Sequence, residues 1–216
     1  MTTPFLGLLR LDTRFPRQPG DAGLAASWPL PVRVKVVSGA TPARVVQEAD
    51  PALLPPFIDA AHALVAEGAA AITTSCGFLV QFQAALQAAL PVPVWTSSLL
   101  LLPELQRPGV LTVDAQALGA GHLQAAGADA ATPVVGLAPG CRFQRTLLED
   151  WPTLDPVVAR SDAVAAAMQL VQQHPQVQNI VLECTNLAPY AQAIAVATRR
   201  PVHHLITFVA QRWSSR

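Results

Sequence analysis

The chain has 216 residues, of which 51% are hydrophobic and 13% are charged. This apolar content is enough for one large domain, or for two smaller ones that share a core. The 14 Lys and Arg residues balance the 14 Asp and Glu residues, so the net charge favours neither nucleic acid nor an anionic membrane surface as a partner.

The N-terminal segment MTTPFLGLLRLDTRF has no basic leader, and Arg10 and Asp12 interrupt its apolar stretch. We therefore expect neither a signal peptide nor a membrane-spanning helix. Three cysteines are an odd number, which favours free thiols in a reducing compartment over a disulfide framework. No CxxC pair or Cys/His cluster indicates a metal site. These features predict a cytoplasmic protein that binds no metal.

Short β-branched or leucine-rich runs alternate with alanine-rich stretches of helical length, a pattern typical of βα units around a parallel sheet. In chain order, the predicted strands cover residues 5–9, 32–37, 70–73, 92–95, 109–113, 134–137, 180–182 and 202–206. The predicted helices cover residues 53–67, 78–89, 115–126, 144–148, 161–174, 189–198 and 207–213. The fold class is therefore α/β.

The segment 14–31, after the first strand, contains four prolines and two glycines. Proline lacks a backbone donor and glycine weakens regular structure, so we expect a long irregular loop here. Long loops near strand ends often carry function, and a mobile surface loop is the alternative.

Cys76 lies between a buried strand and a helix in the stretch AAAITTSCGFLVQFQAAL. At a helix N-terminus, unpaired N–H groups and the helix dipole stabilise a thiolate, so the pKa of this thiol should lie below the free value of about 8.5. Thr74 and Ser75 can cap the helix or bind a ligand carboxylate.

Cys184 has the same setting in the stretch NIVLECTNLAPYAQAIAVAT, where Pro189 suits a first helical turn. A lone cysteine in an apolar segment is usually an inert core residue. Two cysteines half a chain apart in matching strand-to-helix turns favour catalysis instead, because open α/β sheets bind ligands at the carboxyl ends of their strands. Cys141 lacks this setting, and we expect it to be structural.

Four segments, TTSCGF, LECTNLAPYA, LGLLRLDTRF and GVLTVDAQAL, resemble the signature segments of the aspartate/glutamate (Asp/Glu/hydantoin) racemase superfamily. The resemblance covers most of the chain. It implies two pseudo-symmetric α/β lobes, each a mostly parallel sheet flanked by helices, with the active site in the cleft between them. We expect residues 1–95 plus 200–216 in the first lobe and residues 96–199 in the second.

The resemblance also implies an isomerase of amino acid metabolism, a racemase or epimerase that needs neither pyridoxal phosphate nor another cofactor. Cys76 and Cys184 would act alternately as base and acid on the carbon next to a carboxylate. The charge of the carbanion would spread into that carboxylate, which hydroxyl, amide and backbone N–H groups would hold. The candidates for this role are Thr74, Ser75, Gly77, Thr185 and Asn186.

Further candidates lie just after the first strand. Asp12 and Thr13 could orient Cys76 or bind a substrate amino group, or they could simply cap a loop. Arg10, Arg14 and Arg17 could bind a side-chain carboxylate, although arginines on loops are commonly solvated. Among these three we favour Arg14.

Other functions remain open on the same fold. They are hydantoin racemase, arylmalonate-type decarboxylase and maleate-type isomerase, in which the two cysteines can act unequally. A non-catalytic protein that binds small carboxylates is an alternative of another class. In every case the expected partner is a small carboxylate-bearing molecule, with no nucleic acid and no membrane. A homodimer is expected only from the general frequency of symmetric dimers.

Overall fold

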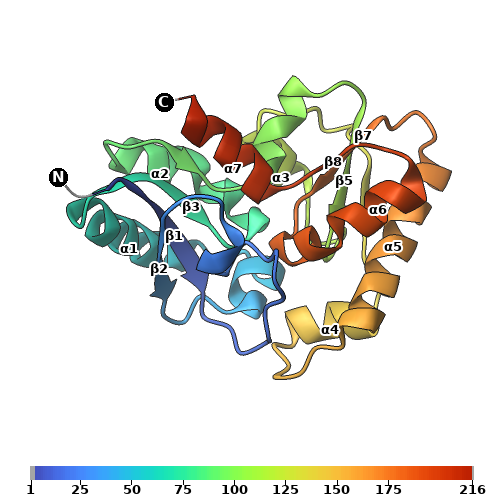
Figure 1. Ribbon diagram of the computed structural model, residues 1–216, viewed down its shortest axis with the longest axis horizontal. Coiled ribbons are helices and arrows are strands. Elements are labelled where there is room, and N and C mark those ends of the chain that lie inside the picture. Colours follow the sequence, from blue (N-terminus) through green and yellow to red (C-terminus); the bar gives the residue numbers. More distant parts are fainter. Residues whose placement is uncertain (1–2, 216) are drawn as a thin grey trace.

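The computed structural model describes residues 3–215, which form two four-stranded parallel sheets flanked by helices (Figure 1). The strand order is β2-β1-β3-β4 in the first sheet and β6-β5-β7-β8 in the second. Both sheets thus follow one topology, which confirms the α/β fold with two pseudo-symmetric lobes. The strands are β1 (Phe5–Leu11), β2 (Val32–Val37), β3 (Ala69–Thr74), β4 (Val94–Trp95), β5 (Pro108–Thr112), β6 (Val134–Gly136), β7 (Asn179–Leu182) and β8 (Val202–His203).

Helices cover both sheets, as Figure 1 shows, with α1 and α2 beside the first sheet and α5 and α6 beside the second. The helices are α1 (Leu54–Ala66), α2 (Gln83–Ala89), α3 (Ala120–Ala125), α4 (Arg142–Leu148), α5 (Pro156–Gln173), α6 (Ala191–Thr198) and α7 (Leu205–Ser214). Shorter 3-10 or π turns lie at Ala25–Ser27, Ala43–Gln47, Pro51–Leu53, Gly77–Phe82, Ser98–Glu104 and Thr185–Tyr190.

Strand β1 shows why the central strands read as apolar runs. Successive side chains of a strand point to opposite faces of the sheet, so a strand covered on both faces is apolar throughout. Phe5 and Leu9 pack into the main core, which includes side chains of α1. Leu6 packs on the other face in a second cluster, with Trp28 and residues of α7.

All eight predicted strands are present, and the main difference concerns the last one. Residues 202–206 were expected to form a strand that returns to the first lobe with the C-terminal helix. Instead β8 ends at His203 and pairs with β7 in the second sheet. The chain turns into α7 because His204 and Thr207 form a reciprocal cap at the helix start. Helix α7 does pack against β1 and β3 of the first sheet, through a cluster that includes Leu6 and Ala71. The exact lobe boundaries stay a prediction.

The helix predicted over residues 115–126 is reduced to α3. The Asp114 carboxylate accepts hydrogen bonds from the N–H groups of Gln116 and Ala117, at 2.9 and 3.4 Å. This side-chain turn competes with helix formation after β5. A helix therefore begins only after Gly119.

The loop over residues 14–31 is irregular, as predicted, and it is anchored to the second lobe. Arg14 forms an ion pair with Asp150, with Nε and Oδ2 3.1 Å apart. Asn186 donates a hydrogen bond of 2.6 Å to Asp21. The loop therefore bridges the two lobes.

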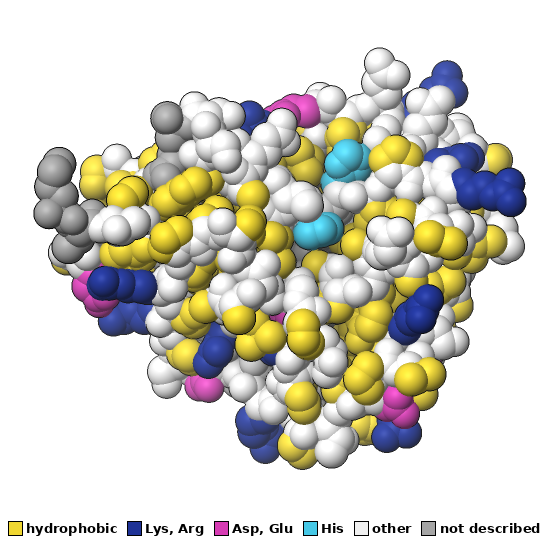
Figure 2. All heavy atoms as spheres, in the orientation of Figure 1, with side chains coloured by type: hydrophobic (Ala, Val, Ile, Leu, Met, Phe, Trp, Pro, Cys, Tyr) yellow, Lys and Arg dark blue, Asp and Glu magenta, His cyan; other side chains and the backbone are white. Residues whose placement is uncertain are grey.

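Within residues 3–215, no helix combines the length and apolarity needed to cross a bilayer. On the face shown in Figure 2, the Lys, Arg, Asp and Glu side chains are scattered among apolar and uncharged ones.

Candidate active site

The two cysteines occupy equivalent places in the two lobes. Cys76 follows β3 and immediately precedes the 3-10 helix Gly77–Phe82. Cys184 follows β7 and immediately precedes the 3-10 helix Thr185–Tyr190. Strands β3 and β7 are both third in chain order within their sheets. The predicted pairing of strand-to-helix turns is therefore present, although each turn opens as a 3-10 helix.

Both cysteines line one small cavity, of about 30 Å³, at the carboxyl ends of the strands. Cys76 is partly exposed and Cys184 is buried. Most of the wall is apolar, and these residues are Leu11, Phe15, Pro42, Val46, Phe78, Val113, Leu147 and Leu148. The polar residues on the wall are Arg17, Ser75, Glu183, Thr185 and Asn186. A few polar groups among mostly apolar side chains are typical of the lining of small-molecule sites.

The predicted hydroxyl groups differ in what they can offer a ligand. Thr74 is buried outside the cavity wall, and its hydroxyl donates to the Thr96 carbonyl at 2.6 Å. The Thr185 hydroxyl donates to the Ser75 carbonyl at 2.6 Å, which joins the two lobes. The Ser75 hydroxyl accepts the backbone N–H of Leu11 at 3.0 Å. A hydroxyl has a single proton, so of these three hydroxyls only that of Ser75 keeps its proton for a ligand.

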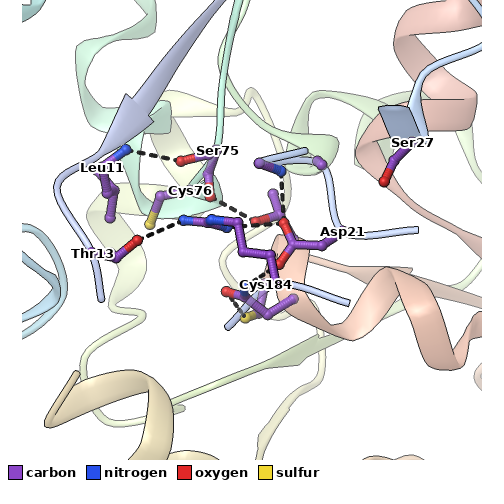
Figure 3. Close-up of polar contacts among 12 residues, drawn as sticks. Leu11, Thr13, Asp21, Ser27, Ser75, Cys76 and Cys184 are labelled. Carbon is purple, nitrogen blue, oxygen red and sulfur yellow. Dashed lines mark hydrogen bonds and ion pairs between the residues drawn. The ribbon is translucent and has the colours of Figure 1, made fainter. Parts of the chain in front are cut away.

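A buried ion pair extends from the loop into the cavity (Figure 3). Arg17 donates to the Asp21 carboxylate at 2.9 Å and to the Thr13 hydroxyl at 3.0 Å. The Arg17 side chain is 6% exposed and the Asp21 side chain 2%. The other oxygen of Asp21 accepts the amide N–H of Asn186, whose own carbonyl oxygen accepts the Cys184 thiol at 3.7 Å. A chain of polar contacts thus links the guanidinium to the second thiol.

Glu183 is fully buried in the cavity wall, directly before Cys184. Its Oε2 accepts the Thr112 hydroxyl at 2.6 Å, while Oε1 has no hydrogen-bond partner among residues 3–215. Burial raises the pKa of this carboxyl to about 8, although the Thr112 hydrogen bond opposes the shift. The carboxyl is therefore mostly protonated at neutral pH.

Both thiols are harder to ionise than a free cysteine. Burial raises the pKa of Cys76, and a charged Glu183 would raise it further, while Arg17 and the N–H groups of Phe78 and Leu79 lower it. Burial likewise raises the pKa of Cys184, with added contributions from Glu183, Cys76 and Asp21. The expected low pKa of Cys76 is therefore wrong for the free protein, because the loss of solvation outweighs the helix N-terminus.

Like Thr74 and Gly77, the three predicted site residues just after β1 do not line the cavity. Asp12 is exposed and accepts the Gly39 N–H at 3.1 Å, the loop cap that was its alternative role. Arg14 is bound to Asp150, and its side chain is 74% exposed. Thr13 reaches the site only through Arg17.

Two predicted neighbours of the cysteines keep structural contacts. Gly77 lies against Glu183, where an added Cβ would come within 2.4 Å of two oxygens. Asn186 lines the cavity.

Cys141 lies outside the cavity, and its sulfur accepts the Gln144 N–H at 3.5 Å at the start of α4. Among the described residues, no group of three or more His, Cys, Asp or Glu side chains could hold a metal ion.

Arg17, Asp21 and Glu183 complete the site. Arg17 was one of the three candidate arginines, although Arg14 was favoured, whereas Asp21 and Glu183 were not among the predicted site residues. The four-residue spacing of Arg17 and Asp21 is compatible with an ion pair, but it lies in an irregular loop where spacing says little. Glu183 had only its position beside Cys184 as a signal.

Comparisons with known proteins identify relatives and structural neighbours. No protein-family model matches the chain. The chain is 31% identical to a dimethylsulfoniopropionate lyase of Durusdinium sp. clade D, over 93% of this chain and 71% of the relative. It is 30% identical to dimethylsulfoniopropionate lyase 7 of Emiliania huxleyi, over 94% of this chain and 64% of the relative. The chain thus spans about two thirds of the length of these relatives.

Solved structures with the same fold belong to the racemase superfamily. Allantoin racemase from Klebsiella pneumoniae matches with a TM-score of 0.71 at 13% identity, over 99% of this chain and 87% of that one. Unliganded arylmalonate decarboxylase matches with a TM-score of 0.58 at 19% identity, over 93% and 87%. Glutamate racemase from Bacillus anthracis matches with a TM-score of 0.55 at 18% identity, over 92% and 76%.

These matches correct the expected activity. The curated relatives are lyases, so the expected isomerase, an amino-acid racemase using both thiols on one carbon, is wrong. The chain therefore has the fold of the aspartate/glutamate racemase superfamily, as the structural neighbours show, and by sequence it belongs to the family of the dimethylsulfoniopropionate lyases.

Proposed function

We propose that this chain is a lyase that cleaves dimethylsulfoniopropionate by elimination, with Cys76 as the base. The observation that carries the proposal is the pair of cysteines in one buried cavity of a chain 31% identical to a dimethylsulfoniopropionate lyase. The relatives are longer than this chain, so their substrate is a proposal here and not a transferred fact.

The chemistry of this substrate needs only one base. The Cys76 thiolate takes the proton from the carbon next to the carboxylate, and the electron pair of that C–H bond forms the new C=C bond. The neighbouring C–S bond breaks and its electrons stay on sulfur. The products are dimethyl sulfide, acrylate and the proton on Cys76, which then passes to solvent. Because dimethyl sulfide leaves as a neutral molecule, it needs no proton from the enzyme.

Several contacts favour Cys76 over Cys184 as the base. Arg17 and the N–H groups of Phe78 and Leu79 act to lower the pKa of the Cys76 thiol, against the effect of burial. The pKa of the Cys184 thiol is lowered only by the Asn186 N–H group, while Glu183, Cys76 and Asp21 add to the increase caused by burial. This thiol also donates its proton toward the Asn186 side chain. The sulfonium cation of the substrate would itself stabilise a thiolate in the cavity, because opposite charges attract strongly where water is excluded.

The polar and the apolar residues of the cavity wall suit the two different ends of the substrate. Arg17 uses its N–H groups on Asp21 and Thr13 but has more donors than these contacts occupy. It can therefore bind the carboxylate together with the Ser75 hydroxyl. The apolar wall, with the Phe78 ring, can receive the methyl groups of the sulfonium and attract its charge.

The test is to incubate the purified protein with dimethylsulfoniopropionate and measure dimethyl sulfide by gas chromatography and acrylate by liquid chromatography. Cys76→Ser should lower kcat by about a hundredfold to ten-thousandfold, the usual effect of losing a general base. Cys184→Ser should keep measurable turnover. Cys141→Ser is the matched control, since this thiol lies outside the cavity, and it should be fully active.

The same assay separates the alternatives. Absence of both products with wild-type protein would refute the lyase. Release of carbon dioxide from arylmalonates alone would point to a decarboxylase, and calorimetric binding of carboxylates without turnover would point to a binding protein. The thiol chemistry also supports the expected location in the reducing cytoplasm, because oxidation of either cysteine would remove its acid/base function. A homodimer stays a prediction that light scattering can test.

A further inference from the structure

The carboxyl group of Glu183 combines features that packing alone does not explain. It is fully buried and lines the cavity. Glu183 directly precedes Cys184 in the sequence, and it lies against Gly77, the residue that follows Cys76. Oε1 has no hydrogen-bond partner among the described residues. Leaving a buried polar atom without a partner costs free energy, so such an atom in a native site suggests a partner that arrives with the ligand.

The contacts of Glu183 also locate its proton. Oε2 accepts the Thr112 hydroxyl at 2.6 Å, so the proton of the neutral acid belongs on Oε1. The thiols of Cys76 and Cys184 lie close enough to Glu183 that a charge on its carboxyl raises the pKa of both. Arg17 and Asp21 act on the same two thiols. A neutral Glu183 adds no negative charge to a cavity in which a thiolate must form.

We propose that Glu183 works in its protonated form, donating a hydrogen bond from Oε1 to the substrate carboxylate as that group takes up the negative charge of the carbanion. This inference rests on the proposed proton abstraction next to a carboxylate. The Glu183 proton stays on Oε1 throughout, and no bond to it is made or broken. A neutral acid in an apolar site is a strong donor to a developing anion, because water does not compete for the hydrogen bond.

Two substitutions distinguish this role from the alternatives. Glu183→Gln keeps the shape and a donor group but cannot ionise, and it should keep kcat within about tenfold of wild type. Glu183→Met removes the donor and should lower kcat about a hundredfold to a thousandfold, the usual effect of losing one such donor. KM should change little, because the hydrogen bond strengthens only as charge develops. Circular dichroism and thermal melting of both variants establish that they fold.

The pH profile provides a readout that a merely structural residue would not change. As the pH rises through about 8, Glu183 loses its proton, so the wild-type enzyme loses a donor and gains a charge beside both thiols. The ratio of wild-type to Glu183→Gln activity should therefore fall across this range. A Gln variant as inactive as the Met variant, or a ratio independent of pH, would overturn the proposal. So would a Met variant with wild-type kcat.

An infrared measurement makes failure of this inference distinguishable from failure of the proposed substrate. The difference spectrum between wild type and Glu183→Gln should contain the C=O stretch of a protonated carboxyl at neutral pH, and this band should disappear above a pH of about 8. The band requires no turnover. If dimethylsulfoniopropionate is not cleaved but the band is present, the substrate is wrong and the protonated donor stands. If the band is missing at neutral pH, this inference fails whatever the substrate.

Discussion

Replacing Asp21 with asparagine tests whether the buried ion pair holds the loop on the site. Asp21 accepts hydrogen bonds from Arg17 at 2.9 Å, from the Gly23 N–H at 2.6 Å and from Asn186 at 2.6 Å. An amide can still accept from Arg17 and Gly23 through its oxygen, but its NH₂ group would face the NH₂ of Asn186. Asn186 would then have to turn, and its NH₂ in place of its oxygen would face the Cys184 thiol.

The magnitude follows from burial. Both side chains are almost completely buried, with 6% exposure for Arg17 and 2% for Asp21. Removing one partner of such a pair leaves an uncompensated charge and typically costs about 3–5 kcal/mol. For a chain of this size, 1 kcal/mol corresponds to a shift in Tm of about 2–4 °C. We therefore expect Asp21→Asn to lower Tm by about 6–20 °C.

The assay is guanidinium and thermal denaturation of wild type, Asp21→Asn and a matched control. Glu149→Gln is the control, because Arg145 and Glu149 form an ion pair with the same spacing but with side chains about half exposed. It should leave the unfolding midpoint unchanged within error. The double variant Arg17→Met, Asp21→Leu should recover much of the lost stability, since it removes both charges. A loss below about 1 kcal/mol for Asp21→Asn, the range of exposed pairs, would refute the reasoning.

Three further outcomes can be measured with the same methods. Gly77→Ala should lower the free energy of unfolding by about 1–3 kcal/mol and abolish activity, because the new Cβ would lie 2.4 Å from the backbone oxygen of Glu183. Its control Gly121→Ala has no heavy atom within 4 Å of the new Cβ and lies in α3, so it should be neutral or stabilising by up to about 1 kcal/mol. Glu183→Gln should gain stability relative to wild type as pH rises from 4.5 to about 8, the unfolded and folded pKa values of Glu183. Between these two pH values the unfolded wild-type chain has lost this proton while the folded protein keeps it. The unfolding free energy of wild type therefore falls by up to about 1.4 kcal/mol per pH unit, and the difference from Glu183→Gln should level off above the folded pKa. A gain confined to acid pH would contradict the buried neutral acid. Thr185→Val should cost about 1–3 kcal/mol, because it leaves the Ser75 carbonyl that joins the lobes without its donor; an unchanged midpoint would show that this bridge is dispensable.

Much of the fold could be predicted from the sequence because its signals are local. Apolar runs, alanine-rich stretches and proline positions reflect periodicities that each element carries within itself. They were sufficient for the eight strands and for the two cysteines at matching strand ends, whereas the two equivalent lobes were implied by the resemblance to the racemase superfamily. These local signals gave wrong element boundaries where a side-chain cap determines where a helix begins, as at Asp114 before α3 and at His204 before α7.

The arrangement of the site needed the tertiary structure, because its contacts join residues far apart in the chain. Asn186 and Asp21 are 165 positions apart, and nothing in the local sequence favours Arg17 over Arg14 as the arginine inside the cavity. The state of Glu183 likewise depends on surroundings that several elements build together, among them β5 and the 3-10 helix after Cys76. By itself, the sequence determined where the two thiols stand. Only the folded chain decided which polar groups surround them, because burial and charge in a cavity are properties of all its walls at once.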